Sequence, residues 1–167
     1  MLLRKNDSGR SIVEMLGVLA IMGVITVMGI SGYSQAVGKI NRNSVVEQVV
    51  KLAQETRGLF AGRGSYNEDD TKTESYDIAG TLLTKMGLKL ENPYGQKYTV
   101  DSFGSTGNNP GFVITIPGVS QDDCLYFTTM AWNDTLDEAE PHSVITNKAY
   151  SSCDQEGSGN VVSVYFR

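Results

Sequence analysis

Glu14 is the residue whose type and position most clearly call for chemistry. It is a carboxylate at the leading edge of an almost unbroken apolar run, GRSIVEMLGVLAIMGVITVMGI, at residues 9–30. A carboxylate carried to the centre of a membrane costs about 2.5–3.5 kcal/mol if nothing neutralises it. The chemistry predicted here is therefore ion pairing with a cation.

The two cysteines, Cys124 and Cys153, are the second candidates for chemistry. In the cytoplasm, two such thiols would usually be buried and inert. If the polar part of the chain lies outside the cytoplasm, a disulfide between them is the default expectation. The N-terminal segment therefore has to decide the compartment.

Residue patterns for catalysis, phosphate binding or metal binding are weak. His142 is the only histidine and lies in an acidic loop, and no nucleophile stands beside a base in a known motif. The glycine-rich stretch at 104–111 lacks the lysine and the following helix of a phosphate loop. We expect no enzyme activity, no cofactor and no metal site. Calcium binding by scattered acids has no EF-hand spacing to support it, the acids being Asp122, Asp123, Asp134, Asp137 and Glu138.

Length and charge limit the class of protein. The chain has 167 residues, of which 40% are hydrophobic, enough for one domain with a modest core. The formal net charge of -5 gives no support to nucleic-acid binding. Most acids follow residue 65, in short runs that predict a solvated face.

The apolar segment predicts a single membrane-spanning helix. Residues 15–38, 24 in all, carry no charged side chain. As a helix they would be about 36 Å long, against a hydrocarbon layer of about 30 Å. Arg4, Lys5 and Arg10 precede the segment, which favours a cytoplasmic N-terminus.

Three interpretations of this segment compete. A cleaved secretory signal is disfavoured because the uncharged run is long and no A-x-A site follows it. A plain single-pass anchor leaves Glu14 without a partner. In the third interpretation, the carboxylate has a dedicated partner that is created after synthesis.

The residues before Glu14 favour the third interpretation. The stretch G-R-S-I-V-E places Gly9 at the end of a short charged leader, with glutamate at the fifth position after it. This resembles the type IV prepilin signature, in which a peptidase cuts after the glycine and the new N-terminal residue is methylated. The resemblance implies a leader at residues 1–9, cleavage between Gly9 and Arg10, and N-methylation of Arg10. Arg10 departs from the Phe, Met, Leu or Val that this family most often has there.

The resemblance also supplies a partner for Glu14. Cleavage would free an α-amine, a cation absent from the precursor. In an assembled filament, the carboxylate of one subunit could neutralise the amine of a neighbour or its own. Glu14 would then dock a subunit in register as the subunit moves from the membrane into the filament.

The segment after residue 37 predicts that the helix continues with one apolar side. We expect one long helix at residues 10–62, with a membrane half at about 15–38, and a globular head at 63–167. Polar positions such as Arg42 and Gln48 are predicted to face away from the head. The apolar positions recur at steps of three and four, and they are Val37, Ile40, Val45, Val46, Val49, Leu52, Ala53, Thr56, Leu59 and Phe60.

The rest of the chain predicts a small sheet with short helices. Strands are expected around residues 98–101, at 111–116 in the centre of the sheet, and at 160–166. An amphipathic helical piece is expected between Ile78 and Met86, ending at Gly87. A helix of about three turns is expected after Ser120, which has Asp123 at capping-box spacing.

These elements give an α+β fold, and the resemblance implies the type IV pilin fold, with a long helix on an antiparallel sheet and one disulfide. A Cys124–Cys153 bridge between a late helix and the last strand is similar to that of type IVb pilins. The implied function is a structural pilus subunit, held in the inner membrane as a precursor and then exported to the cell surface. Its partners would be other pilin subunits, the prepilin peptidase and an inner-membrane assembly platform. The alternatives are a type II secretion pseudopilin and an unrelated domain on an uncleaved anchor.

Overall fold

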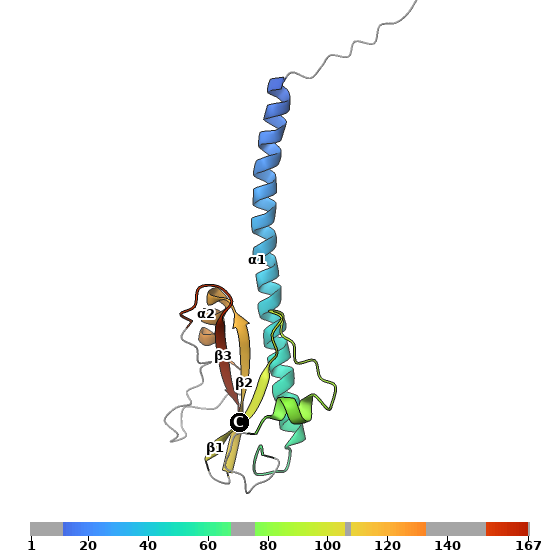
Figure 1. The fold of residues 1–167 in the computed structure, drawn as a ribbon, viewed down its shortest axis with the longest axis vertical. Coiled ribbons are helices and arrows are strands. Elements are labelled where there is room, and N and C mark those ends of the chain that lie inside the picture. Colours follow the sequence, from blue (N-terminus) through green and yellow to red (C-terminus); the bar gives the residue numbers. More distant parts are fainter. Residues whose placement is uncertain (1–11, 68–75, 106–107, 133–152, 167) are drawn as a thin grey trace, which may run out of the picture. The chain divides into compact units, whose positions relative to one another are not determined.

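The computed structural model describes residues 12–67, 76–105, 108–132 and 153–166. The chain divides into two units, Met1–Ile40 and Asn41–Arg167. One helix, α1 (Ile12–Leu59), belongs to both units (Figure 1). The amphipathic second half of α1 therefore belongs to the second unit, residues 41–167, which is called the compact unit below.

A three-stranded antiparallel sheet forms the centre of the compact unit. Its strands are β1 (Thr99–Ser105), β2 (Asn108–Val119) and β3 (Asn160–Phe166), in the order β1-β2-β3. The prediction that the strand around 111–116 is central is confirmed. Ile114 pairs with Val100 on one side and Val164 on the other, so apolar side chains align across one face.

The regular pairing of β2 with β3 is interrupted between Ile116 and Val119. Two residues explain the interruption. Pro117 has no N–H to donate to the ladder. Gly118 has a φ of 77°, and a Cβ there would lie 2.7 Å from Cγ of Gln96. The chain therefore needs glycine at the point where it leaves the sheet for the next helix.

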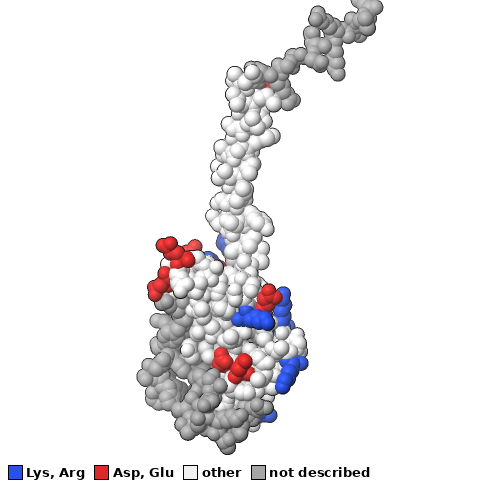
Figure 2. Space-filling model, in the orientation of Figure 1, with Lys and Arg blue, Asp and Glu red and all other residues white. Residues whose placement is uncertain are grey.

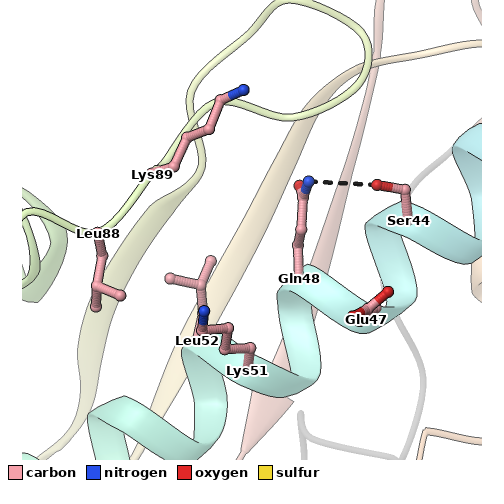
Figure 3. A pocket seen from close by; sticks show the side chains of 7 residues that line it. All are labelled: Ser44, Glu47, Gln48, Lys51, Leu52, Leu88 and Lys89. Atoms are coloured by element: carbon pink, nitrogen blue, oxygen red, sulfur yellow. Dashed lines mark hydrogen bonds between the residues drawn. The ribbon is translucent and has the colours of Figure 1, made fainter.

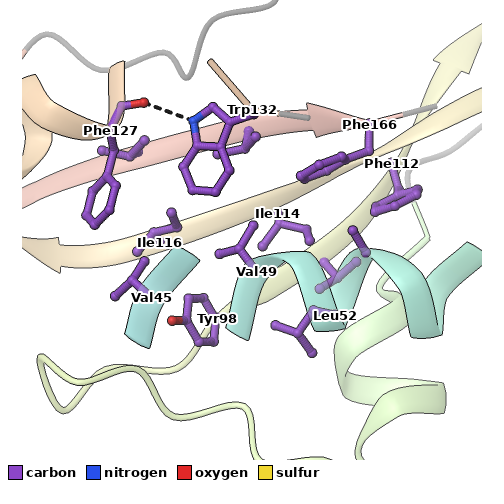
Figure 4. Packing of buried hydrophobic residues seen from close by; sticks show 14 of the residues in the cluster. Val45, Val49, Leu52, Tyr98, Phe112, Ile114, Ile116, Phe127, Trp132 and Phe166 are labelled. Atoms are coloured by element: carbon purple, nitrogen blue, oxygen red, sulfur yellow. Dashed lines mark hydrogen bonds between the residues drawn. The ribbon is translucent and has the colours of Figure 1, made fainter. Parts of the chain in front are cut away.

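The core lies between one side of α1 and the apolar face of the sheet (Figure 4). Val45, Val49 and Leu52 lie one turn apart on α1 and are almost fully buried. Burying each such side chain contributes roughly 1.5–3 kcal/mol. Tyr98 closes one edge, and its hydroxyl donates a 2.8 Å hydrogen bond to Oε1 of Gln48. The sheet supplies Val100, Phe112, Ile114, Ile116, Val162, Val164 and Phe166.

The end of the core is covered by α2 (Gln121–Thr129). The N-cap prediction is confirmed, because Oγ of Ser120 accepts a hydrogen bond from the Asp123 amide. The helix has nine residues, close to the three turns predicted, and ends before Trp132. The Trp132 indole donates a 2.9 Å hydrogen bond to the Phe127 carbonyl and packs into the core (Figure 4).

The expected amphipathic piece after Ile78 is reduced to a short π-helix, η1 (Ala79–Leu83). Its start is capped by Asp77, whose carboxylate accepts a 2.7 Å hydrogen bond from the Gly80 amide. Gly87 follows with a φ of 73° and ends the segment as predicted. Helical character here is limited to a single buried turn.

Three predictions about the faces of α1 are wrong. Ile40 was placed on the packed side, yet it is 65% exposed. Arg42 and Gln48 were placed on the solvent side, but Arg42 binds Asp123 and Gln48 accepts from Tyr98. Polar groups at the edge of the packed face were misassigned because their partners lie 81 and 50 residues further along the chain.

Candidate functional site

The candidate assembly segment is the first part of α1, from Ile12 to Ile40. Its large apolar side chains, apart from the partly buried Val37, are 47–78% exposed, so within this chain they have no core to enter. The helix is long and apolar enough to cross a membrane, with a mean hydropathy of 2.2 over its most apolar window. Figure 2 shows this stretch almost free of charge, whereas charged side chains gather on the compact unit. The expected membrane half is thus a continuous helix.

Small and hydroxyl residues fit this helix without distorting it. The Thr26 hydroxyl donates a 2.8 Å hydrogen bond to the Met22 carbonyl, and the Ser34 hydroxyl donates one of 3.1 Å to the Ser31 carbonyl. Nothing within 4 Å would meet a Cβ at the segment's glycines. These glycines are therefore not required by packing within one chain. They are Gly17, Gly23, Gly29, Gly32 and Gly38.

Glu14 lies in the first turn of α1. A negative charge there is favoured by the partial positive charge of the helix N-terminus. Gly9 and Arg10, the predicted cleavage and methylation residues, lie outside the described residues. Cleavage, methylation and the pairing of Glu14 with an α-amine stay predictions.

The two cysteines form the expected disulfide. Cys124 lies in α2, Cys153 precedes β3, and both are buried. The Gln121 amide donates a 3.2 Å hydrogen bond to the Cys153 carbonyl beside the bridge. The bridge thus ties the first turn of α2 to the segment that leads into the last strand.

A polar network that the sequence did not reveal lies next to this bridge. Asp123 is 7% exposed, although its acidic run predicted a solvated face. Its carboxylate accepts hydrogen bonds from Arg42 on α1 and, at 2.9 Å, from the Tyr94 hydroxyl. Arg42 also lies over the Tyr126 ring, 5.2 Å from its centroid. The one local signal was the spacing of Asp123 from Ser120, which predicted a cap and not an ion pair.

The network has consistent protonation. The hydrogen bond to Asp123 raises the pKa of Arg42, so its guanidinium stays charged. Burial, followed by the hydrogen bond to Asp123, raises the pKa of Tyr94, so its hydroxyl keeps the proton that it donates. The turn that carries Tyr94 is itself fixed, since Oδ1 of Asn92 accepts from the Tyr94 and Gln96 amides.

One open pocket of about 280 Å³ lies between α1 and the segment at residues 88–89 (Figure 3). Its floor is apolar and its rim carries charges of both signs. Within it, Gln48 donates to Oγ of Ser44 at 3.3 Å. No nucleophile and base converge there. The lining residues are Ser44, Glu47, Gln48, Lys51, Leu52, Leu88 and Lys89.

Metal-binding clusters are not seen in the described part of the chain: no three His, Cys, Asp or Glu side chains come together there. Asp122 and Asp123 diverge, since the first is exposed and the second is buried against Arg42. His142 and the acids Asp134, Asp137 and Glu138 lie outside the described residues.

A long apolar helix continued by an amphipathic half, an antiparallel sheet and one late disulfide together define a type IV pilin-like protein. The family described as PilS N terminal, a type IV pilin-related family, matches residues 39–164, about three quarters of the chain. The chain belongs to this family. No curated protein matches its sequence. Pilins are structural proteins that assemble with other pilin subunits, and α1 supplies a candidate membrane anchor.

Proposed function

We propose that this chain is a structural subunit of a type IV pilus, polymerised through the first half of α1. The observation that carries the proposal is an uncharged helix over residues 15–38 whose large apolar side chains, apart from the partly buried Val37, stay exposed. Such a surface needs either lipid or identical helices around it. The five glycines would let neighbouring helices approach closely, because no side chain occupies that space.

The proposed assembly route begins in the inner membrane. A prepilin peptidase cuts between Gly9 and Arg10, the new amine is methylated, and an assembly platform moves the subunit into the fibre. Glu14 then neutralises an α-amine inside the filament core. A carboxylate and an ammonium buried together avoid the cost of burying either one alone.

Mass spectrometry of the protein from sheared surface fibres tests this route. The expected result is a mature chain that begins at Arg10, carries one N-methyl group and contains the disulfide. A full-length chain with Met1 intact, absent from fibres, would contradict the proposal and favour an uncleaved anchor.

Glu14→Ala and Glu14→Gln separate docking from processing. Both variants should still be cleaved after Gly9, because the peptidase recognises the residues before the cut. Both should be lost from fibres, since neither side chain can neutralise an amine. Glu47→Gln, which removes an exposed charge from the compact unit, is the matched control and should assemble normally. Normal incorporation of Glu14→Ala would remove the docking role.

A further inference from the structure

One buried carboxylate joins three segments of the compact unit. Asp123 in α2 binds Arg42 of α1 through Oδ1 and Tyr94 of the Asn92–Gly95 turn through Oδ2. Each oxygen therefore has its own donor. Arg42 keeps a side-chain exposure of 30%, whereas Asp123 has 9%. The pair thus joins a nearly buried acceptor to a partly exposed cation.

Arg42 occupies a distinctive place along α1. Among the described residues, it is the first in α1 whose side chain makes a hydrogen bond to another element. The apolar contacts begin one turn later, at the fully buried Val45, and continue at Val49. Ile40, just before Arg42, is largely exposed. Arg42 therefore holds the turn that precedes the first apolar contact.

The acceptor is held rigidly from both sides. The Asp123 amide donates to Oγ of Ser120, and the next residue, Cys124, is bonded to Cys153. Tyr94 restrains the other carboxylate oxygen. A side chain fixed by its own helix cap, an adjacent disulfide and a second donor loses little freedom when it binds a third group.

From this arrangement we propose that Asp123 is a positioning residue that, through Arg42, sets the residue at which α1 begins to attach to the rest of the compact unit. Without the ion pair, the turn before Val45 has no buried apolar side chain to hold it, so Val45 becomes the last attached residue and opens more often. The free part of α1 then grows by about one turn.

The biological role of this ion pair rests on the proposed function. In a filament, the number of α1 residues not attached to their own head decides which side chains can meet neighbouring helices. A defined starting point for packing gives every subunit the same free length. An ion pair suits this role better than another valine. A guanidinium and a carboxylate bind in few relative positions, so the pair fixes where α1 lies along the compact unit.

The test uses the full chain in detergent micelles with labelled valine methyl groups and a soluble paramagnetic relaxation agent. In Asp123→Asn, relaxation of the Val45 methyls should rise by about threefold or more, as expected for local opening. The methyls of Val49 and Val164 should change little. Arg42→Gln should reproduce this pattern, and the double variant should add nothing to either single change.

Two controls keep the result specific. Asp122→Asn removes the same charge from the neighbouring exposed residue and should leave Val45 unchanged. Arg42→Lys keeps a cation and should restore much of the protection. If Asp123→Asn fails to fold, as judged by Trp132 fluorescence, Arg42→Gln gives the same measurement from the partly exposed side of the pair.

Three outcomes would overturn the proposal: unchanged Val45 relaxation in both single variants, equal increases at Val45, Val49 and Val164, or full additivity in the double variant. The measurement does not need filaments. A wild-type chain that never assembled would contradict the proposed function and leave this test intact.

Discussion

Arg42 and Asp123 form an ion pair although 81 positions separate them in the sequence. Arg42 belongs to the long helix and Asp123 to the first turn of α2, directly before a disulfide-bonded cysteine. The pair brings the helix that carries the assembly segment together with the part of the fold that the disulfide restrains. Stability of the head and attachment of α1 are thus linked at one place, and the following predictions test the surrounding contacts.

The disulfide should account for a large part of the stability of the compact unit. Replacing both cysteines, Cys124→Ser with Cys153→Ser, should lower the free energy of unfolding by about 3–4 kcal/mol. The reason is that the bridge closes a loop in the unfolded chain and so lowers its conformational entropy. Urea unfolding of the full chain in a mild detergent, followed by the fluorescence of Trp132, measures this change. A dithiol reductant should lower the urea midpoint of the wild type by the same amount as the double substitution does, and it should leave the midpoint of the double variant unchanged.

Leu52 tests the packing between α1 and the sheet. Leu52→Ala leaves a cavity in the core and should cost about 2–5 kcal/mol. Leu125→Ala is the matched control, since Leu125 lies in α2 but is 51% exposed, and its cost should stay within about 0.5 kcal/mol. The same urea titration compares them. Equal losses in both variants would mean that the core was assigned incorrectly.

Ser120 tests the start of α2. Ser120→Ala removes the acceptor of the Asp123 amide and should lower the free energy of unfolding by about 1 kcal/mol. Ser120→Thr keeps the hydroxyl and should retain most of the stability. Thermal unfolding by circular dichroism measures both variants. No loss in Ser120→Ala would show that the hydroxyl does not cap the helix.

Tyr94 and Tyr98 should make the compact unit sensitive to alkali. Burial raises the pKa of both phenols above the ordinary value of about 10 that the unfolded chain keeps. As the pH rises through that ordinary value, the unfolded chain loses these protons first, so the free energy of unfolding falls. The stabilisation is complete below about pH 10 and is lost progressively above it.

Urea midpoints measured from pH 8 to pH 11 would show this loss. Tyr98→Phe should reduce the slope of the midpoint against pH above pH 10, whatever its effect at neutral pH. A slope unchanged by Tyr98→Phe would assign the alkaline loss to other groups.

Local patterns determined much of the architecture. The run at residues 15–38 predicted a membrane-spanning helix because it is long enough and carries no charged side chain. The periodicity of the segment after residue 37 predicted the packed stripe around Val45 and Val49. Alternation predicted the last strand at 160–166, in which Val162, Val164 and Phe166 share a buried face. Each of these signals depends on residues close together in sequence, where geometry is fixed by the helix or strand itself.

The tertiary structure decided what depends on distant partners. In the sequence, Asp123 cannot be told from the exposed Asp122, and only the approach of Arg42 and Tyr94 makes one of them a buried acceptor. The positions of Gln48, Trp132 and the short η1 turn also depend on contacts made in the tertiary structure. Polar side chains have no periodicity that reveals their partners, because a hydrogen bond needs a single atom at the right place, whereas burial of an apolar side chain needs only a face.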